Sequence, residues 1–98
     1  MEIIEVMENK KNYIELLLLA DEQEDMIDRY IDKGKMYVLD DNGIKCECVV
    51  IDVGNGVLEI KNIATVPEYQ GKGYAKAMID FLITKYREEY STLQVGTG

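Results

Sequence analysis

The stretch ATVPEYQGKGYAKAMIDFLITKY, residues 64–86, changes its conformational preference twice along its length. An extended apolar run enters it and ends at Pro67, because proline lacks the amide proton that a strand hydrogen bond needs. A helical pattern then follows Gly71 and Gly73. The two glycines therefore lie in a turn that joins a strand to a helix. Either they only relieve backbone strain in this turn, or they also let an anion reach the free amides at the start of the helix.

The charges around this turn favour an anion. Lys72 and Lys76 are cationic side chains of the turn and the first helical residues, and the Gln70 amide can donate a hydrogen bond. The formal net charge of the chain is −8, but residues 1–60 carry 6 basic and 15 acidic side chains, whereas residues 61–98 carry 5 and 4. The turn is thus a suitable site for a phosphate or pyrophosphate group.

Other phosphate-binding motifs fit this turn less well. A Walker loop needs Gly-x-x-x-x-Gly-Lys followed by Ser or Thr, and the segment GKGYAK has neither the spacing nor the hydroxyl. A dinucleotide-binding fingerprint needs a third glycine where Lys76 stands. A kinase glycine loop joins two strands rather than a strand and a helix.

Periodicity and turn residues divide the chain into strands and helices. In order, they predict a strand (2–6), two helices (about 12–20 and 21–33), three strands (35–40, 44–52 and 57–66), a helix (from about 74) and a strand (91–95). Asn12 and Asp21, each with a glutamate three residues later, are the predicted helix caps. Hairpin turns at Asn42-Gly43 and at residues 54–56 make the three central strands antiparallel.

The last predicted helix has apolar side chains spaced by three and four residues, which indicates one buried stripe. The stripe consists of Ala75, Met78, Ile79, Leu82, Ile83 and Tyr86. The strands on either side of this helix can pair in parallel. The sequence therefore predicts an α+β fold with a mixed, mostly antiparallel sheet flanked by helices, in one domain that spans residues 1–98.

Composition argues against several classes of partner. Hydrophobic residues make up 47% of the chain and charged residues 31%, as in a folded globular domain. The longest apolar run, Leu16–Ala20, is too short to span a bilayer and the start of the chain has no basic leader. We therefore expect a cytoplasmic protein without membrane contact. The negative net charge also argues against nucleic acid as a partner.

The cysteines favour neither a disulfide nor a metal site. Cys46 and Cys48 alternate within a predicted strand, so their side chains share one face and we expect buried free thiols. The chain contains no histidine, and two cysteines alone do not complete a zinc site. We expect no metal.

The segment NIATVPEYQGKGYAKAMIDFL resembles the acyl-coenzyme A binding motif of the GNAT superfamily of N-acetyltransferases. Gln70, Gly73 and Ala75 match the family pattern Arg/Gln-x-x-Gly-x-Gly/Ala, and Pro67 stands where the family often has a proline. The order of predicted elements also resembles a GNAT domain, so the resemblance covers essentially the whole chain. It implies a GNAT-like fold and an acetyl-CoA dependent enzyme that moves an acetyl group directly from coenzyme A to an amine of unknown identity.

The resemblance also implies which residues hold acetyl-CoA, the cosubstrate. Backbone groups of Ile63, Ala64 and Thr65 would pair with the pantetheine arm as an added strand does. The pyrophosphate would be held by the turn and the start of the helix, which comprise Gln70, Gly71, Lys72, Gly73, Tyr74 and Ala75. Backbone amides at the end of the strand would polarise the thioester carbonyl.

The candidate catalytic residue is a carboxylate. Direct transfer requires a deprotonated amine, and a chain without histidine leaves carboxylates as candidate bases, often acting through water. We assign this role to Glu59, because strand alternation places it on one face with Lys61, Ile63 and Thr65 in the strand that leads to the thioester. The alternative is that Glu59 only pairs with Lys61 on a solvated face.

The C-terminal end of the sequence departs from the family. GNAT domains normally continue beyond LQVGTG, residues 93–98, into a helix and a closing hairpin, and that helix often carries a tyrosine that acts as general acid. No tyrosine of this chain matches that position, and we assign no general acid. We expect a GNAT-like domain that is truncated after the strand following the coenzyme-binding helix.

The sequence leaves the acceptor and the partners open. The acceptor is a small-molecule or protein amine. An acidic run either attracts a cationic acceptor or forms a solvated helix face; it comprises Asp21, Glu22, Glu24, Asp25 and Asp28. The last strand, at a sheet edge, permits a homodimer. Two alternatives to the enzyme are a catalytically silent coenzyme A binding or protein-interaction module, and a domain in which the glycine turn is purely structural.

Overall fold

The computed structural model describes residues 1–96. Its elements, in chain order, are β1 (Glu2–Val6), the 3₁₀ helix η1 (Lys10–Tyr13), α1 (Ile14–Ala20), α2 (Glu24–Asp28), β2 (Lys35–Asp40), β3 (Ile44–Gly54), β4 (Val57–Thr65), the 3₁₀ helix η2 (Pro67–Tyr69), α3 (Tyr74–Tyr86) and β5 (Thr92–Val95). The strands form one sheet in the order β1-β2-β3-β4-β5. Pairing is antiparallel from β1 to β4 and parallel between β4 and β5. The predicted α+β fold with a mixed, mostly antiparallel sheet is confirmed.

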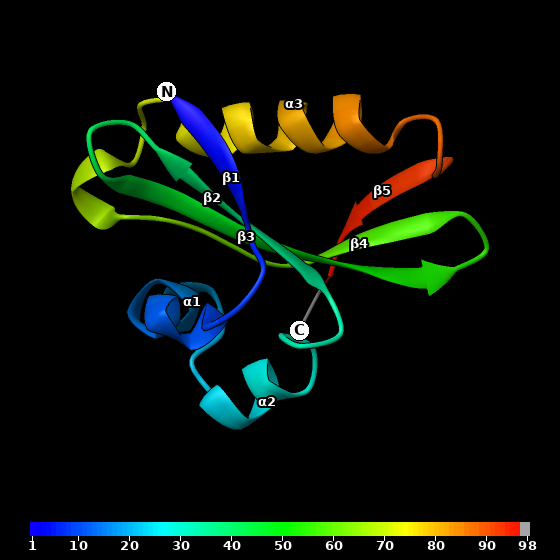
Figure 1. Ribbon diagram of the computed structural model, residues 1–98, viewed down its shortest axis with the longest axis horizontal. Coiled ribbons are helices and arrows are strands. Elements are labelled where there is room, and N and C mark those ends of the chain that lie inside the picture. Colours follow the sequence, from blue (N-terminus) through cyan, green and yellow to red (C-terminus); the bar gives the residue numbers. More distant parts are fainter. Residues whose placement is uncertain (97–98) are drawn as a thin grey trace.

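Helices cover both faces of this sheet, with α3 on one face and α1 and α2 on the other (Figure 1). The hydrophobic cluster on the α3 face comprises Tyr37, Leu39, Cys46, Cys48, Val50, Leu58, Ile60, Met78, Leu82 and Tyr86. The cluster on the face of α1 and α2 comprises Leu17, Ile27, Tyr30, Ile31, Met36, Val38 and Val49. Because successive strand residues point to opposite faces, β2 and β3 contribute side chains to both clusters. Within residues 1–96, no helix is long and apolar enough to cross a membrane.

The predicted hairpins and cysteines are as expected. Asn42 and Gly43 both have positive φ values, 56° and 113°, in the turn between β2 and β3. Cys46 and Cys48 are buried free thiols that share the α3 face. In the part of the chain that the structure describes, no three His, Cys, Asp or Glu side chains are grouped so as to hold a metal ion.

The start of α1 differs from the prediction. Asn12 is not its N-cap: it lies inside η1, where its amide donates to the Asn9 carbonyl at 3.0 Å, and the N-cap of α1 is Tyr13. The reason is that the chain already turns at Asn9, whose φ of 56° is left-handed, and enters α1 through a 3₁₀ turn. Asn12 therefore lies within the helical backbone of η1, whereas an N-cap residue itself has non-helical backbone angles.

The second helix is also shorter than predicted. Gln23, not Asp21, is the N-cap of α2, and the Asp21 carboxylate accepts a hydrogen bond from the Gln23 amide at 3.4 Å. Regular α-helix ends at Asp28, and turns then continue to Gly34, whose amide donates to the Tyr30 carbonyl at 2.9 Å. The hydrogen bond from the Gln23 amide to the Asp21 carboxylate closes a local turn, and such a turn competes with helix capping.

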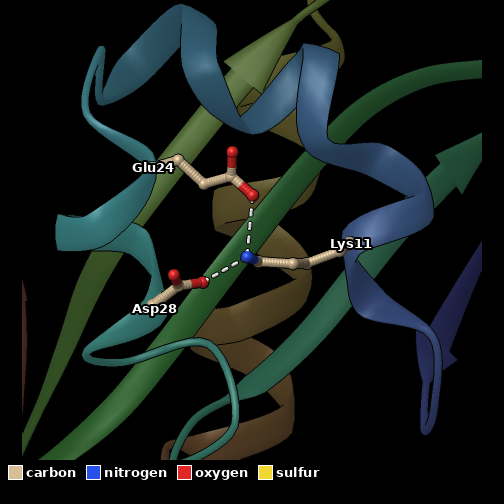
Figure 2. A network of polar contacts seen from close by, with 3 residues as sticks. All are labelled: Lys11, Glu24 and Asp28. Atoms are coloured by element: carbon tan, nitrogen blue, oxygen red, sulfur yellow. Dashed lines mark hydrogen bonds and ion pairs between the residues drawn. The ribbon is translucent and has the colours of Figure 1, made fainter.

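One ion-pair network joins η1 to α2 (Figure 2). Lys11 Nζ lies 2.7 Å from Glu24 Oε2 and 2.5 Å from Asp28 Oδ1. The contacts with Asp28 and then Glu24 raise the pKa of Lys11 to about 12. Two of the acidic side chains of α2 are therefore directed at η1.

The buried stripe of α3 is rotated relative to the prediction. Met78, Leu82 and Tyr86 are buried as expected, but Ala75 and Ile83 are exposed. Three other side chains of the helix pack against the cluster instead, namely Tyr74, Ala77 and Phe81. Phe81 accounts for this rotation, because its ring packs edge-on against Tyr37 with a centroid distance of 5.1 Å.

Candidate active site

β4 has a strand on both sides along only part of its length. β3 pairs with it from Val57 to Thr65, whereas β5 pairs with it only as far as Ile60, opposite Val95. The Gly96 amide donates to the Ile60 carbonyl at 2.9 Å. Beyond this bond, no strand of residues 1–96 lies beside this edge of β4. The backbone of residues 61–65 therefore offers a free edge to which an extended ligand can add as a strand.

A β-bulge lies at the start of this free edge. Val49 of β3 pairs with Asn62, and the next residue, Val50, pairs with Ile60. β4 therefore has one extra residue, Lys61, at this point. Because one extra residue reverses the alternation of side chains, residues before and after Lys61 do not follow a single strand pattern.

The bulge places Glu59 on the other face from the one predicted. Ile60 and Ile63 both pack toward the α3 cluster, although they are three residues apart. Glu59 lies opposite Ile51 of β3, on the face covered by α1 and α2. The prediction that Glu59 shares a face with Ile63 and Thr65 is therefore wrong.

The turn after β4 has the backbone that the two glycines predict. Gly71 and Gly73 have φ values of 77° and 89°, a backbone conformation that residues other than glycine rarely adopt. Gly73 is the N-cap of α3, and the first bond of that helix runs from the Ala77 amide to the Gly73 carbonyl at 2.9 Å. The amides of residues 74–76 precede this bond and are available to a ligand. Apart from the glycine's own neighbours in the chain, no atom of the described residues lies within 4 Å of a Cβ built on Gly71 or Gly73.

A cavity of about 440 Å³ lies against this turn, and we call it the loop cavity. It is lined by Leu19, Ile63, Ala64, Thr65, Tyr69, Gln70, Gly71, Gly73, Tyr74, Ala75 and Lys76. Of the residues predicted to bind the cosubstrate, only Lys72 is absent from this lining. Leu19 of α1 and Tyr69 of η2 line the cavity without having been assigned from the sequence.

Basic side chains surround the turn, one of them distant in the sequence. Lys76 Nζ pairs with Asp80 Oδ2 at 2.9 Å. Lys72 Nζ and Lys45 Nζ lie 6.0 Å and 4.1 Å from the centroid of the Tyr69 ring. Lys45 belongs to β3, and its carbonyl accepts from the Val66 amide at 2.8 Å, just before the turn. Only strand pairing brings Lys45 here, so no local sequence signal identifies it.

Two further cavities continue from the loop cavity along β4. The strand cavity is lined by Ala20, Ile60, Lys61, Asn62, Ile63, Val95 and Gly96. The helix pocket is lined by Asp21, Met26, Arg29, Tyr30, Lys33, Ile51, Lys61 and Gly96. Ile63 is shared by the first two cavities, and Lys61 and Gly96 are shared by the last two. The three cavities therefore adjoin one another from the glycine turn to α2.

Glu59 lies beside the junction of the strand cavity and the helix pocket. Its Oε2 is 2.8 Å from Lys61 Nζ, and Gln94 Nε2 donates to its Oε1 at 2.6 Å. The hydrogen bond from Lys61, followed by that from Gln94, lowers the pKa of Glu59, which is therefore ionised at neutral pH. A Cβ on Gly96 would lie 3.0 Å from Glu59 Oε2, so a larger residue at this position would press on the Glu59 carboxylate. The ion pair between Glu59 and Lys61 that the alternative interpretation predicted is therefore present, and it lies next to the strand cavity and the helix pocket.

Comparison with known proteins assigns the chain to a family. A family model described as an acetyltransferase (GNAT) domain matches residues 32–97. This match covers more than half of the chain, and the chain belongs to the GNAT acetyltransferase family.

The relatives are bacterial acetyltransferases. An uncharacterized N-acetyltransferase of Bacillus subtilis, YvbK, is 30% identical over 93 residues, which cover 93% of this chain and 60% of YvbK. The structure of a GNAT family acetyltransferase from Elizabethkingia anophelis with acetyl-CoA bound is 30% identical with a TM-score of 0.89, and the match covers 99% of this chain and 65% of that one. A Bacillus subtilis acetyltransferase in complex with CoA is 29% identical, with a TM-score of 0.87 and the same coverage. The chain thus spans less than two thirds of the length of these relatives.

Proposed function

We propose that this chain binds acetyl-CoA in the loop cavity and along the free edge of β4, and transfers the acetyl group to an amine in the helix pocket. The observation that supports this most directly is that the three cavities neighbour one another along β4, where they share the lining residues Ile63, Lys61 and Gly96. Such a path can bring a thioester and an amine together at the end of β5. The two similar structures that contain acetyl-CoA or CoA support the choice of cosubstrate.

The groups proposed to hold the cosubstrate fit its chemistry. Gly71 and Gly73 leave open space beside the N-terminus of α3, where backbone amides and the helix dipole favour a pyrophosphate. The Tyr74 hydroxyl donates to Asp41 Oδ2 at 2.7 Å, so it is the backbone amide of Tyr74 that is available to the ligand. Gln70 Nε2 lies 3.4 Å from the Thr65 carbonyl, a long hydrogen bond that a phosphate oxygen can replace. Lys72 would add long-range attraction, since it does not line the loop cavity.

The pantetheine arm is proposed to pair with the backbone of Ile63, Ala64 and Thr65. These residues belong to the part of β4 that has β3 on one side and no strand of the described chain on the other. Their unpaired backbone groups are those that an added strand uses. Amides of this edge are also suitably placed to polarise a thioester carbonyl.

Glu59 is proposed to accept the proton that the amine loses. In direct transfer the amine nitrogen bonds to the acetyl carbon, the carbon–sulfur bond breaks, and one proton leaves the nitrogen. Glu59 is ionised and lies next to Lys61, which lines both the strand cavity and the helix pocket. Its lowered pKa makes Glu59 a weak base, and the proton can reach it directly or through one water molecule.

Glu59→Gln tests this role. The amide keeps the size of the side chain but cannot take up a proton, so we expect acetyl transfer at neutral pH to fall by about 10²-fold or more. Acetyl-CoA affinity should stay unchanged. The measurement is release of the coenzyme thiol with a panel of amines, with Glu15→Gln on the exposed side of α1 as the matched control.

Two outcomes would change the account. Unchanged turnover in Glu59→Gln would leave Glu59 as only the partner of Lys61. Saturable acetyl-CoA binding without transfer to any amine would instead support the coenzyme A binding module without catalysis.

A further inference from the structure

The helix pocket has the opposite charge balance from the chain as a whole. It encloses about 310 Å³, which is within the range of small-molecule sites. Three cationic side chains line it, Arg29, Lys33 and Lys61, against a single carboxylate, Asp21. The whole chain has 11 basic and 19 acidic side chains. A cationic lining is therefore not what the composition alone would produce.

Two of these cations have no acidic partner in the described chain. Lys61 is paired with Glu59. Arg29 and Lys33 are exposed side chains that form no ion pair with any of residues 1–96. Two of the three acidic side chains of α2 are directed away from the pocket, because Glu24 and Asp28 both contact Lys11 on η1 (Figure 2).

Two carboxylates at or beside the pocket, Asp21 and Glu59, form no ion pair with these two cations. Asp21 Oδ2 accepts a hydrogen bond from the Tyr30 hydroxyl at 3.3 Å. Glu59 lies beside Lys61 and Gly96, at the end of the pocket that adjoins the strand cavity. The pocket therefore has positive charge where Arg29 and Lys33 line it. It has negative charge at the end that adjoins the strand cavity, where Glu59 lies.

We propose that the acceptor is a small amine that also carries a carboxylate, as an amino acid does, and that Arg29 and Lys33 bind this carboxylate. This inference rests on the proposed function. The amine end then points toward Glu59 and the strand cavity, where transfer is proposed to occur. Arg29 can bind a carboxylate through two parallel hydrogen bonds, and Lys33 adds a second positive charge.

The test compares amines that differ only in the carboxylate. The ¹⁵N-labelled 98-residue chain is titrated by NMR with leucine, phenylalanine and lysine, and with the amide of each. We expect at least one amino acid to bind about tenfold or more tightly than its amide, with shifts at Arg29, Tyr30 and Lys33. Equal or tighter binding of the amides overturns the proposal in favour of a cationic acceptor. Binding of none of the six compounds overturns it as well.

Variants assign the selectivity to the pocket. Arg29→Gln and Lys33→Gln should each reduce amino acid affinity by about tenfold and leave amide affinity unchanged. Arg87→Gln is the matched control, because Arg87 is the only other arginine and lies just after α3, beside a different cavity. Selectivity that survives both pocket variants overturns the assignment.

A separate acetyl-CoA titration distinguishes this proposal from the proposed function. If the chain binds acetyl-CoA but shows no preference for amino acids over their amides, only the acceptor class is wrong. If it shows the preference but does not bind acetyl-CoA, the pocket assignment stands and the transferase proposal fails.

Discussion

Glu47 is a buried carboxyl group without a partner in the described chain. It lies in β3 between Cys46 and Cys48, so its side chain points to the face of α1 and α2, and it is fully buried. Neither carboxylate oxygen has a hydrogen-bond partner in the described structure. Burial raises the pKa of Glu47 from its ordinary value of 4.5 to about 8. Folding therefore favours the protonated form.

This shift predicts how the stability of the chain depends on pH. Below pH 4.5 Glu47 is protonated in both the folded and the unfolded chain. Between 4.5 and about 8 only the folded chain holds the proton, so the contribution of Glu47 to the free energy of unfolding falls with rising pH, by at most about 1.4 kcal/mol per pH unit. Glu47→Gln removes this titration. We expect its stability relative to the unmodified chain to increase from pH 5 to pH 8.

Urea denaturation at pH 5, 6.5 and 8 measures this difference. Glu2→Gln, at an exposed position of β1, is the control. A difference for Glu47→Gln that does not change with pH would mean that Glu47 has an ordinary pKa.

At the scale of elements, Asn62 of β4 anchors the helical segment. Its Nδ2 donates to the Leu17 carbonyl in α1 and to the Tyr30 hydroxyl after α2, both at 3.0 Å. Asn62 is buried, so its removal would leave both acceptors without this donor. We expect Asn62→Ala to lower the free energy of unfolding by about 2 kcal/mol.

Asn12→Ala is the matched comparison on η1. Asn12 is exposed and is not a helix cap, so we expect a change within about 0.5 kcal/mol, whereas a true N-cap costs about 1 kcal/mol. Chemical denaturation of both variants at one pH provides the measurement. Equal losses would mean either that Asn12 caps α1 after all or that Asn62 anchors nothing.

These elements also indicate what sequence patterns can predict. The strands, the hairpin turns and the strand–turn–helix around Gly73 are local patterns, and the structure has each of them where it was expected. The bulge at Lys61 cannot be predicted from composition, because the extra residue does not differ in type from other strand residues. It nevertheless moves Glu59 to the other face of the sheet. Local patterns are therefore reliable only between such irregularities.

At the scale of the whole molecule, charge is distributed by tertiary structure rather than by sequence segment. The acidic run from Asp21 to Asp28 predicted either a solvated helix face or attraction of a cationic acceptor. In the fold, Glu24 and Asp28 are paired with Lys11, while Arg29 and Lys33 line the helix pocket. Neither the pairing nor the pocket could be predicted, because both depend on how η1 and α2 pack against the sheet.

Some predictions about the molecule stay untested. The sheet ends at β1 on one side and β5 on the other within the described residues, and a homodimer through such an edge remains a prediction. The expectations of one domain over residues 1–98, of a cytoplasmic location and of no nucleic acid partner have the same standing.

The central claim is that the glycine turn binds the pyrophosphate of acetyl-CoA, and a pair of substitutions at Gly73 tests it. Gly73→Asp and Gly73→Asn both place a side chain of similar size at a φ of 89°, where it meets no protein atom of the described chain. They differ in charge. If an anion binds here, the aspartate repels it and the asparagine does not.

The decisive measurement is a calorimetric titration of the 98-residue chain and both variants with acetyl-CoA. Our account predicts saturable binding by the unmodified chain and an affinity at least about tenfold lower for Gly73→Asp than for Gly73→Asn, with the difference shrinking at high salt. Equal affinities of the two variants, or no binding by the folded unmodified chain, would contradict it.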